Sequence, residues 1–295
     1  MLKRGVLVLL SLVLLILSFA LVGCNKNTEF DNNENENNTA NDNNQLSIKD
    51  GKLLVPSDIS LGDYLVFGTY EQDNDLSNGP EDIEWLVISD PKYADDIDIM
   101  VISRYVLDCQ PYHSTETSVT WETCTLRSWL NNEFLNTAFS AEEQEIIINS
   151  EQTANPNFDY PRTNQGNNTY DKVFLLHTLD LTVGAFSEFY DEILGIPTNY
   201  ALSKGLETDS REKLNGKYAC EWWLRTAGIS GDHVATVNGR EVSSHGPRVN
   251  VGAYYLDSTK GLGVRPALVI KIEKSDSIND NLIKGTTYQS EVVDD

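Results

Sequence analysis

The sequence has few basic residues for its length. Lysine and arginine account for 22 of 295 residues, against 45 aspartates and glutamates, so the formal net charge is −23. Nucleic acids and anionic lipid surfaces are themselves negative, and no basic stripe in the sequence offsets the acidic excess. We therefore expect neither a nucleic acid nor an anionic lipid surface as a binding partner.

The sequence also lacks the short motifs of common enzyme chemistry. It contains no Gly-x-Ser-x-Gly nucleophile turn, no His-Glu-x-x-His zinc helix, no P-loop and no Cys-x-x-Cys pair. The four histidines are scattered, which favours ordinary loop or strand positions over metal ligands. Acidic residues are numerous enough for a glycosidase-like carboxylate pair, but abundance does not identify one. We predict no catalytic residue.

The sequence has only four cysteines, and three of them, an odd number, follow the N-terminal segment. Cys109, Cys124 and Cys220 follow Cys24 in the chain. In an oxidising compartment, one disulfide with a leftover thiol and three buried thiols are both compatible with this count. The pairing of these three residues is left open.

A long apolar run occurs only at the N-terminus. Lys3 and Arg4 precede the uncharged segment 6–22, the charged and apolar parts of a secretory signal. Its length is about the minimum for a membrane span, so an uncleaved anchor is the alternative. The stretch Leu21-Val22-Gly23-Cys24 resembles the lipobox of bacterial lipoproteins, which implies palmitate-type acyl chains carried through the Cys24 thiol. We expect a lipid anchor at the extracellular face of the cell membrane.

Composition divides the rest of the chain into three parts. After a signal peptide at 1–23 is removed, 45 acidic residues face 20 basic ones, because only Lys3 and Arg4 are lost. The lipidated cysteine and an asparagine-rich linker span 24–48, where ten of the positions 25–44 are asparagine. Such a segment buries too little apolar surface to order itself. One globular domain at 49–272 and an acidic flexible tail at 273–295 follow.

Strand-like runs dominate the predicted domain. They fall at 64–70, 83–89, 97–103, 173–176, 222–226, 233–237, 249–255 and 264–272. Helical patterns lie earlier: in 125–134, four apolar residues recur at helical spacing, and weaker patterns cover 179–186, 187–194 and 198–204. Early helices followed by strands predict a single α+β domain of antiparallel strands and a few short helices.

Two local signals fix a helix start and a turn. Ser140 and Glu143 have the spacing of a capping box, in which each side chain accepts a hydrogen bond from the other residue's backbone N–H, and Ile146 and Ile147 follow as the buried face. Asn238-Gly239 separates two strand-like runs and is typical of a type I′ hairpin turn.

Six ordered motifs give the domain a family resemblance. They are Glu84-Trp85-Leu86-Val87-Ile88, Leu107-Asp108-Cys109-Gln110-Pro111-Tyr112, Thr120-Trp121-Glu122 with Leu126-Arg127-Ser128-Trp129-Leu130-Asn131, Asp171-Lys172-Val173-Phe174-Leu175-Leu176, Trp222-Trp223-Leu224-Arg225 and Gly263-Val264-Arg265-Pro266-Ala267-Leu268. This set resembles a bacterial domain of unknown function that is common in extracellular and lipid-anchored proteins. Its last two motifs are similar to the formylglycine-generating-enzyme branch of C-type-lectin-like folds, which implies a C-type-lectin-like arrangement. The catalytic cysteines of those enzymes have no counterpart after Cys220, so their activity does not transfer.

The tryptophans and arginines of the last two motifs are candidates for ligand binding. If 222–226 is a strand, only one of Trp222 and Trp223 can face a given layer, and the other covers a second layer or lies in a groove. Arg225 and Arg265 lie in apolar strands, where a buried guanidinium needs a partner, and Glu84 is an obvious one. The alternatives are a structural ion pair and a ligand site lined by Trp222, Trp223, Arg225 and Arg265.

An acidic loop offers a candidate metal site. Asp73, Asp75, Ser77, Glu81 and Glu84 carry oxygen atoms at the spacing of a calcium loop. The glycine that such a loop needs is one position late at Gly79, and Glu84 begins a strand motif. A solvated acidic hairpin loop is the alternative to calcium, and we expect no other cofactor.

Taken together, these features predict a lipid-anchored extracellular domain that binds a carbohydrate, cell-wall or protein ligand without catalysis. The alternatives are an extracellular enzyme such as a hydrolase and a structural module of an envelope assembly. Clustered tryptophan, tyrosine and carboxylate side chains in one cleft favour binding or catalysis, whereas a flat apolar patch favours assembly.

Overall fold

The structure is a computed structural model that describes residues 48–91, 98–115, 117–181, 190–214, 216–243, 246–255, 261–275 and 282–283. Cys24, the predicted signal peptide, nearly all of the predicted linker and most of the predicted tail lie outside these ranges. Within them, no helix is long and apolar enough to cross a bilayer.

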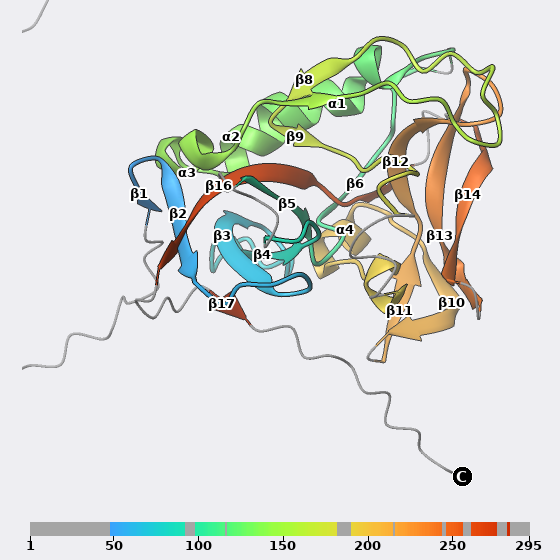
Figure 1. Cartoon of the computed structure of the whole chain (residues 1–295). Coiled ribbons are helices and arrows are strands. Elements are labelled where there is room, and N and C mark those ends of the chain that lie inside the picture. The colour runs from blue at the N-terminus through green and yellow to red at the C-terminus, as the bar shows by residue number, and fades with distance from the viewer. Residues whose placement is uncertain are drawn as a thin grey trace, which may run out of the picture. The chain divides into compact units, whose positions relative to one another are not determined.

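The larger of two main sheets lies on the left of the domain in Figure 1, below the helices. Its strands lie in the order β1 (Ile48–Lys49), β2 (Lys52–Pro56), β16 (Ala267–Ser275), β5 (Asp98–Ser103), β4 (Glu81–Val87), β3 (Tyr64–Tyr70) and β17 (Leu282–Ile283). β9 (Val173–Phe174) also pairs with β16. The pairing of β2 with β16 is parallel, and the other pairings in this sheet are antiparallel.

A row of short helices covers one face of this sheet (Figure 1). It contains η1 (Trp121–Thr123), α1 (Thr125–Trp129), the π-helical turn η2 (Leu130–Phe134), α2 (Leu135–Ala138) and α3 (Ala141–Ile146). The buried residues Leu126, Leu130 and Phe134 form the apolar stripe that attaches the row to the core. The capping box at Ser140 and Glu143 is present, with bonds of 2.8 and 3.2 Å.

A second sheet stands beside the first (Figure 1). Its order is β14 (Gly246–Tyr255), β13 (His233–Ser243), β12 (Trp222–Ala227), β15 (Leu262–Val264) and β6 (Asp108–Gln110). Two small ribbons complete the fold: β10 (Thr208–Leu214) with β11 (Lys217–Cys220) packs beside β13, and β7 (Ser150–Gln152) with β8 (Thr169–Asp171) lies beside α1 (Figure 1). The 3₁₀ turn η4 (Tyr190–Ile193) and helix α4 (Asn199–Ser203) precede β10. The domain is α+β, mostly strands with a few short helices.

Trp222 and Trp223 show why the two sheets join in one core. Side chains alternate across β12, so the two indoles enter opposite layers, and they are 0% and 1% exposed. Trp222 donates its ring N–H to the Ile193 carbonyl at 3.1 Å, and Trp223 donates to the Gln110 carbonyl at 2.9 Å. The second indole covers another layer, one of the two outcomes expected from the sequence.

The hairpin prediction at Asn238-Gly239 is wrong. β13 continues through both residues to Ser243, which pairs with Gly246 of β14, so no turn interrupts the strand at 238–239. The register shifts between the Val237–Val249 and Val242–Pro247 pairs, with more residues on β13 than on β14. Asparagine and glycine therefore occupy an irregularity inside a long strand, because cross-strand pairing overrides local turn propensity.

Most other predicted elements are present with shifted ends. The pattern at 198–204 is α4, which begins after the N-cap Thr198. The described part of the pattern at 187–194 contains η4, and residues 182–189, which include most of the pattern at 179–186, lie outside the described residues. Part of the predicted tail is ordered, since the apolar pair Leu282–Ile283 adds β17 to the sheet.

Candidate functional site

A groove of two adjoining hollows lies between segments that are distant in the sequence. The hollows measure about 500 and 430 Å³ and share Gln110, Trp129 and Glu133 in their walls. These residues come from β6, α1 and η2. The loop 71–80 between β3 and β4 and residues of and just after α4 close the larger hollow on the other side. Concave sites of this size that mix aromatic and polar walls are typical of small-ligand binding.

A π-helical turn shapes the wall that carries Trp129 and Glu133. The backbone N–H of Leu135 donates to the Leu130 carbonyl five residues earlier, in place of a regular α-helical pattern. Asn131 donates its side-chain amide to the carbonyl four residues before it, and such bonds compete with the backbone ladder. π turns inside helices are rare and are frequent at functional sites. The widened turn begins directly after Trp129 and contains Glu133.

Trp129 and Glu133 keep hydrogen-bonding capacity unused. Trp129 is half-buried, and its ring packs against the Phe134 ring with the two ring centroids 5.7 Å apart. Among the described residues its indole N–H has no hydrogen-bond acceptor, and the exposed Glu133 carboxylate has neither a hydrogen bond nor an ion pair. An exposed aromatic face, one donor and one acceptor therefore point into the same groove.

Asp108 organises the floor of the larger hollow. Its carboxylate accepts the Tyr70 hydroxyl at 2.6 Å, the Cys109 backbone N–H at 2.6 Å and the Gln110 amide at 3.1 Å. Burial raises the pKa of the Asp108 carboxyl, and the hydrogen bond from Tyr70 opposes this rise. These bonds fix Tyr70 and Gln110, and they leave the Gln110 amide oxygen as a further acceptor.

The charge of the larger hollow is mainly negative. Glu71, Asp108 and Glu133 line it, together with one cation, Lys204. The Lys204 ammonium lies 4.6 Å from the centre of the Tyr200 ring, and a hydrogen bond with Tyr200 raises the pKa of this lysine. Lys204 keeps its charge beside the neutral Tyr200 ring, but three carboxyl groups face this one ammonium, so the carboxylates set the sign of the field in the groove.

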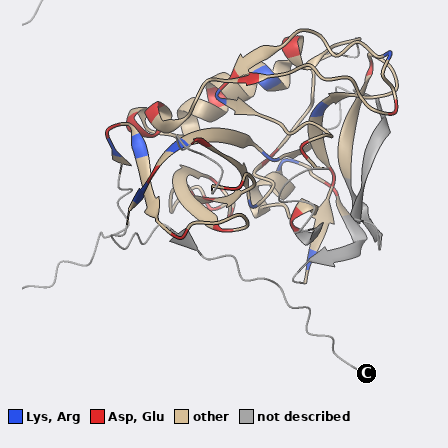
Figure 2. Cartoon of the chain, in the orientation of Figure 1, with Lys and Arg blue, Asp and Glu red and all other residues tan. Residues whose placement is uncertain are grey.

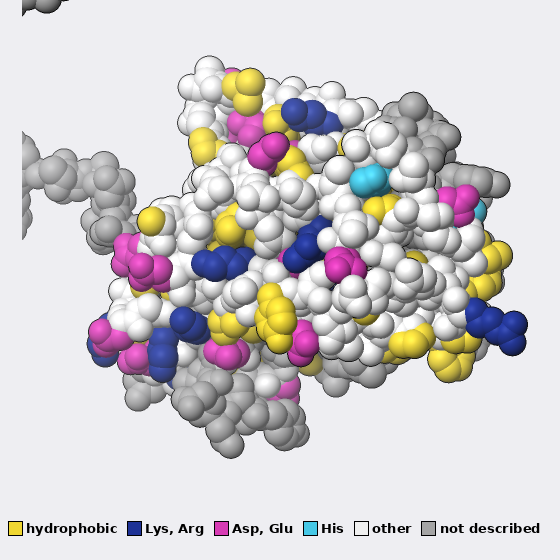
Figure 3. Space-filling view, turned by 90° about the horizontal axis from the view of Figure 1, so that it is seen from above, with side chains coloured by type: hydrophobic (Ala, Val, Ile, Leu, Met, Phe, Trp, Pro, Cys, Tyr) yellow, Lys and Arg dark blue, Asp and Glu magenta, His cyan; other side chains and the backbone are white. Residues whose placement is uncertain are grey.

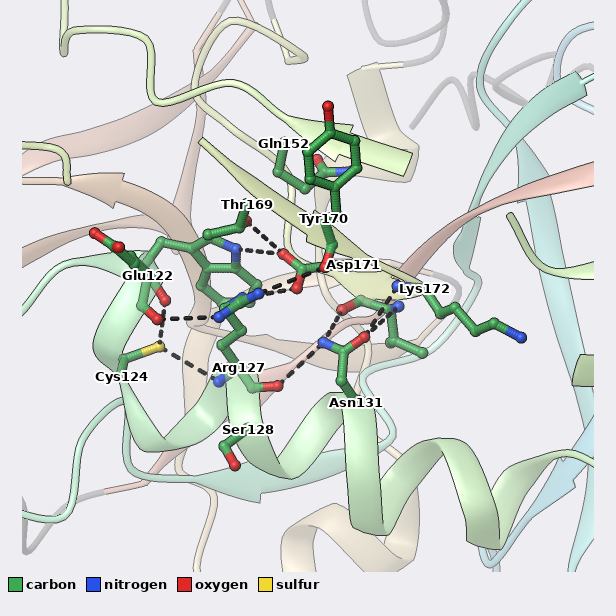
Figure 4. Close-up of polar contacts among 12 residues, drawn as sticks. Glu122, Cys124, Arg127, Ser128, Asn131, Gln152, Thr169, Tyr170, Asp171 and Lys172 are labelled. Carbon is green, nitrogen blue, oxygen red and sulfur yellow. Dashed lines mark hydrogen bonds and ion pairs between the residues drawn. The ribbon is translucent and has the colours of Figure 1, made fainter. Parts of the chain in front are cut away.

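The opposite face of α1 carries a closed polar network, centred on Asp171 (Figure 4). One carboxylate oxygen accepts the Trp121 indole N–H at 3.0 Å and the Thr169 hydroxyl at 2.6 Å, and the other accepts Arg127 Nε at 2.7 Å. The Asp171 side chain is 1% exposed. Its acceptor capacity is taken up by partners within the protein, so it anchors the helix to β8.

Asn131 extends the closed network along the chain (Figure 4). Its amide donates to the Arg127 and Val173 carbonyls at 3.1 and 2.8 Å, and its oxygen accepts the backbone N–H groups of Lys172 and Val173 at 3.0 and 3.1 Å. Arg127 and Asn131 are four residues apart, and Trp129 and Glu133 are four apart on the other helix face. Fixing the first pair therefore orients the second pair toward the groove.

The four residues predicted to bind ligand lie elsewhere. Trp222 and Trp223 are core residues, and Arg265 is 0% exposed with its guanidinium donating to the Ser103 and Glu192 carbonyls at 2.7 and 2.6 Å. Arg225 donates to the Thr153 carbonyl at 2.9 Å and pairs with Asp180 at 3.5 Å. Their burial supports the structural alternative, and we place the candidate site at the groove instead.

Glu84 is not the partner of Arg225 or Arg265. It forms an ion pair with Arg104, which also lies over the Tyr64 ring at 4.6 Å. That prediction is wrong because β3–β4–β5 pairing brings the chain after β5 beside β4, so a closer arginine reaches the carboxylate. The same ion pair takes Glu84 away from the predicted calcium loop.

The acidic loop brings together a different carboxylate set from the predicted one. Glu71, Asp73 and Glu81 each offer an oxygen within 4.8 Å of the others. Asp75 instead accepts the Ser77 hydroxyl and backbone N–H at 2.6 and 3.1 Å. Three hard oxygen ligands suit calcium, but Glu81 also accepts the Gln72 backbone N–H at 2.6 Å, as a metal-free turn would. Calcium at this loop stays a prediction.

The three cysteines of the domain are free and buried. Burial raises the pKa of the Cys109 thiol to about 11 and that of the Cys124 thiol to about 12. A thiol with a raised pKa is a poor nucleophile at neutral pH. Of the two alternatives left open by the sequence, the structure has three buried thiols.

Sequence reasoning missed the groove because its residues come from four separate segments. Trp129 is one of the four apolar residues that recur at helical spacing in 125–134, a pattern that predicts a position in the core. Gln110 and Glu133 had no assigned role. One signal was available: a run of asparagines, Asn131, Asn132 and Asn136, inside a helical pattern predicts competition with backbone hydrogen bonds.

Fold and groove together define an α+β domain with one aromatic and acidic surface site, anchored by a closed network behind it. Residues 97–272 match the family described as "Domain of unknown function (DUF6273)", and the chain belongs to this family. No curated protein and no solved structure matches the chain. The family segment contains every residue of the closed network and the shared groove residues Gln110, Trp129 and Glu133.

Proposed function

We propose that this protein is a lipid-anchored extracellular binding module whose groove holds a carbohydrate of the cell wall or cell surface. The observation that carries the proposal is Trp129, a half-buried indole that lines both hollows beside Glu133 and Gln110 and whose N–H has no acceptor among the described residues. Aromatic faces bind the apolar faces of sugar rings, and flanking acceptors and donors bind hydroxyl groups. Nucleic acid is left out of the proposed ligands because of the acidic net charge.

A glycan and peptidoglycan-fragment screen tests this ligand class. The mature chain in detergent micelles should bind a subset of the glycans. Trp129→Ala should lower the affinity for these glycans by about tenfold or more, as loss of a central aromatic anchor does. Phe158→Ala is a matched control, because Phe158 is 87% exposed and does not line the groove. No glycan retained, or equal loss in both variants, counts against the proposal.

The lipid anchor rests on the lipobox-like Leu21-Val22-Gly23-Cys24 and the charged and apolar segments before it. Metabolic labelling with a fatty acid should mark the wild type and leave Cys24→Ala unlabelled. Label retained in Cys24→Ala would eliminate acylation at this residue, while release of that variant from the membrane would support it.

Hydrolysis is the second candidate function. Two carboxyls in unlike environments, buried Asp108 with a raised pKa and exposed Glu133, line one hollow, and such pairs can divide acid and base roles. New reducing ends on a bound glycan, lost in Glu133→Gln, would favour it over simple binding.

A structural module of an envelope assembly is less well supported. On the face seen in Figure 3, apolar side chains appear in separate small patches between charged ones, and Figure 2 shows acidic and basic residues interspersed along the helical row. Assembly surfaces are usually larger continuous apolar patches.

The C-type-lectin-like arrangement belongs to the same proposal. Its support is the order of the final tryptophan, arginine and Gly-Val-Arg-Pro-Ala motifs. An experimental structure of the domain that fails to superpose on lectin-like folds would remove this part and leave the groove unaffected.

A further inference from the structure

The groove offers more hydrogen-bond acceptors than donors at the junction of its two hollows, which Gln110, Trp129 and Glu133 line. The residues shared by both hollows contribute the free Glu133 carboxylate, the Gln110 amide oxygen and the Trp129 indole N–H. The Gln110 amide nitrogen is already bound to Asp108 at 3.1 Å. A ligand that matches this set must present more donors than acceptors at the junction.

The charges around the junction favour a cationic donor over a neutral one. Glu133 has no cationic partner among the described residues, and the lysine of this hollow lies over the Tyr200 ring. The Trp129 face beside the carboxylate adds attraction for a cation, because aromatic rings are negative at their faces. A neutral sugar hydroxyl can donate a hydrogen bond to the Glu133 carboxylate, but it gains neither the ionic attraction of this carboxylate nor the cation–π attraction of the Trp129 ring.

We propose, on the basis of the proposed carbohydrate-binding function, that the groove selects a glycan bearing a free primary ammonium, an amino sugar without its N-acetyl group, and that Glu133 is the residue that determines this specificity. The sugar ring lies on Trp129 and its ammonium faces the Glu133 carboxylate. An N-acetylated sugar presents a neutral amide of larger volume there and loses the charge-assisted hydrogen bond.

Titration calorimetry with two matched ligands tests the inference. The mature chain in detergent micelles is titrated with a glucosamine trisaccharide and with the N-acetylglucosamine trisaccharide, at a slightly acidic pH where the amine is charged. We expect the first to bind about tenfold more tightly, the effect of one hydrogen bond to a charged group. Added salt should reduce this ratio.

Variants separate specificity from overall binding. Glu133→Gln should bring the two affinities to within about twofold of each other, since it removes the charge and keeps the shape. Glu142→Gln makes the same charge change on α3, outside the groove, and should leave the ratio unchanged. Trp129→Ala should weaken both ligands together.

The outcomes distinguish the two levels of the proposal. Equal binding of both trisaccharides by the wild type overturns the ammonium specificity and leaves carbohydrate binding in place. A preference that survives Glu133→Gln overturns the role of this residue. Binding of neither trisaccharide, together with no glycan retained in the wider screen, overturns the proposed function itself.

Discussion

The two faces of segment 125–138 use their polar side chains in opposite ways. Toward β8 and β9, Arg127 bonds the Asp171 carboxylate and Asn131 bonds the Val173 backbone, so both side chains are engaged within the protein. Toward the groove, the Trp129 indole N–H and the Glu133 carboxylate have no hydrogen-bond partner within the part of the chain that the structure describes. A fully satisfied polar network specifies one arrangement of the chain, whereas unsatisfied exposed groups are available to a ligand. One family motif therefore contains both an anchor and a candidate recognition surface.

The largest expected effect comes from comparing two tryptophans, one on each face, by the loss of stability when each is replaced by alanine. Trp121 is 5% exposed and bound to Asp171, so Trp121→Ala should lower the free energy of unfolding by about 3–5 kcal/mol. Trp129→Ala should cost about 1 kcal/mol, because the ring is half-exposed and its N–H is free. Urea unfolding of the lipid-free chain measures both. Similar losses would show that both faces are structural.

A second test compares two carboxylates. Asp171→Asn replaces an oxygen that accepts Arg127 and should destabilise the fold by about 3 kcal/mol, since it leaves buried partners unmatched. Glu133→Gln should change stability by less than about 0.5 kcal/mol, as exposed substitutions do. If Glu133→Gln proves as costly in urea as Asp171→Asn, the groove carboxylate has a structural role.

The buried His177 predicts that the stability of the fold depends on pH. His177, which follows β9, is 2% exposed, and burial together with the nearby Arg225 lowers its pKa from 6.5 to about 4. The folded state thus favours neutral histidine, and its stability contribution is present above pH 6.5 and lost as the pH falls toward 4. The loss should be on the order of 2 kcal/mol. His177→Gln should show a smaller decline over this range, and an unchanged decline would assign it to other groups.

The smallest expected effect concerns the acidic loop that borders the groove. If Glu71, Asp73 and Glu81 bind calcium, millimolar calcium should stabilise the wild type against chelator by about 1 kcal/mol through mass action. Asp73→Asn with Glu81→Gln should abolish the shift. Asp75→Asn should keep it, because Asp75 bonds Ser77 instead. A wild type whose melting temperature is the same with calcium and with chelator has no such site.

The parts of the fold that the sequence predicted are those decided by near neighbours. The capping box, the helical pattern at 198–204, the amphipathic helix and the strand at Tyr64–Tyr70 depend on residues a few positions apart. The prediction of a hairpin turn at Asn238-Gly239 was wrong because pairing with β14 decides the conformation of β13. Local preference was outweighed by pairing.

The candidate site was beyond prediction for a similar reason. Glu84 was assigned to distant arginines because a charge does not reveal its partner, and the sheet register brought Arg104 to it. The tryptophan and arginine motifs suggested recognition, yet Trp222 and Arg265 are buried. The groove combines segments around residues 71, 110, 133 and 200, whose proximity follows only from the finished topology.

The position of β16 has a consequence for how the protein is made. This strand is nearly the last in the chain, yet it lies inside the large sheet, between β2 near the start and β5. The sheet cannot close until the chain has been synthesised through Ser275, which gives the domain many contacts between distant residues and slow folding. If the chain is exported as proposed, late closure keeps it unfolded and able to thread through a translocation channel, with folding completed outside the cell.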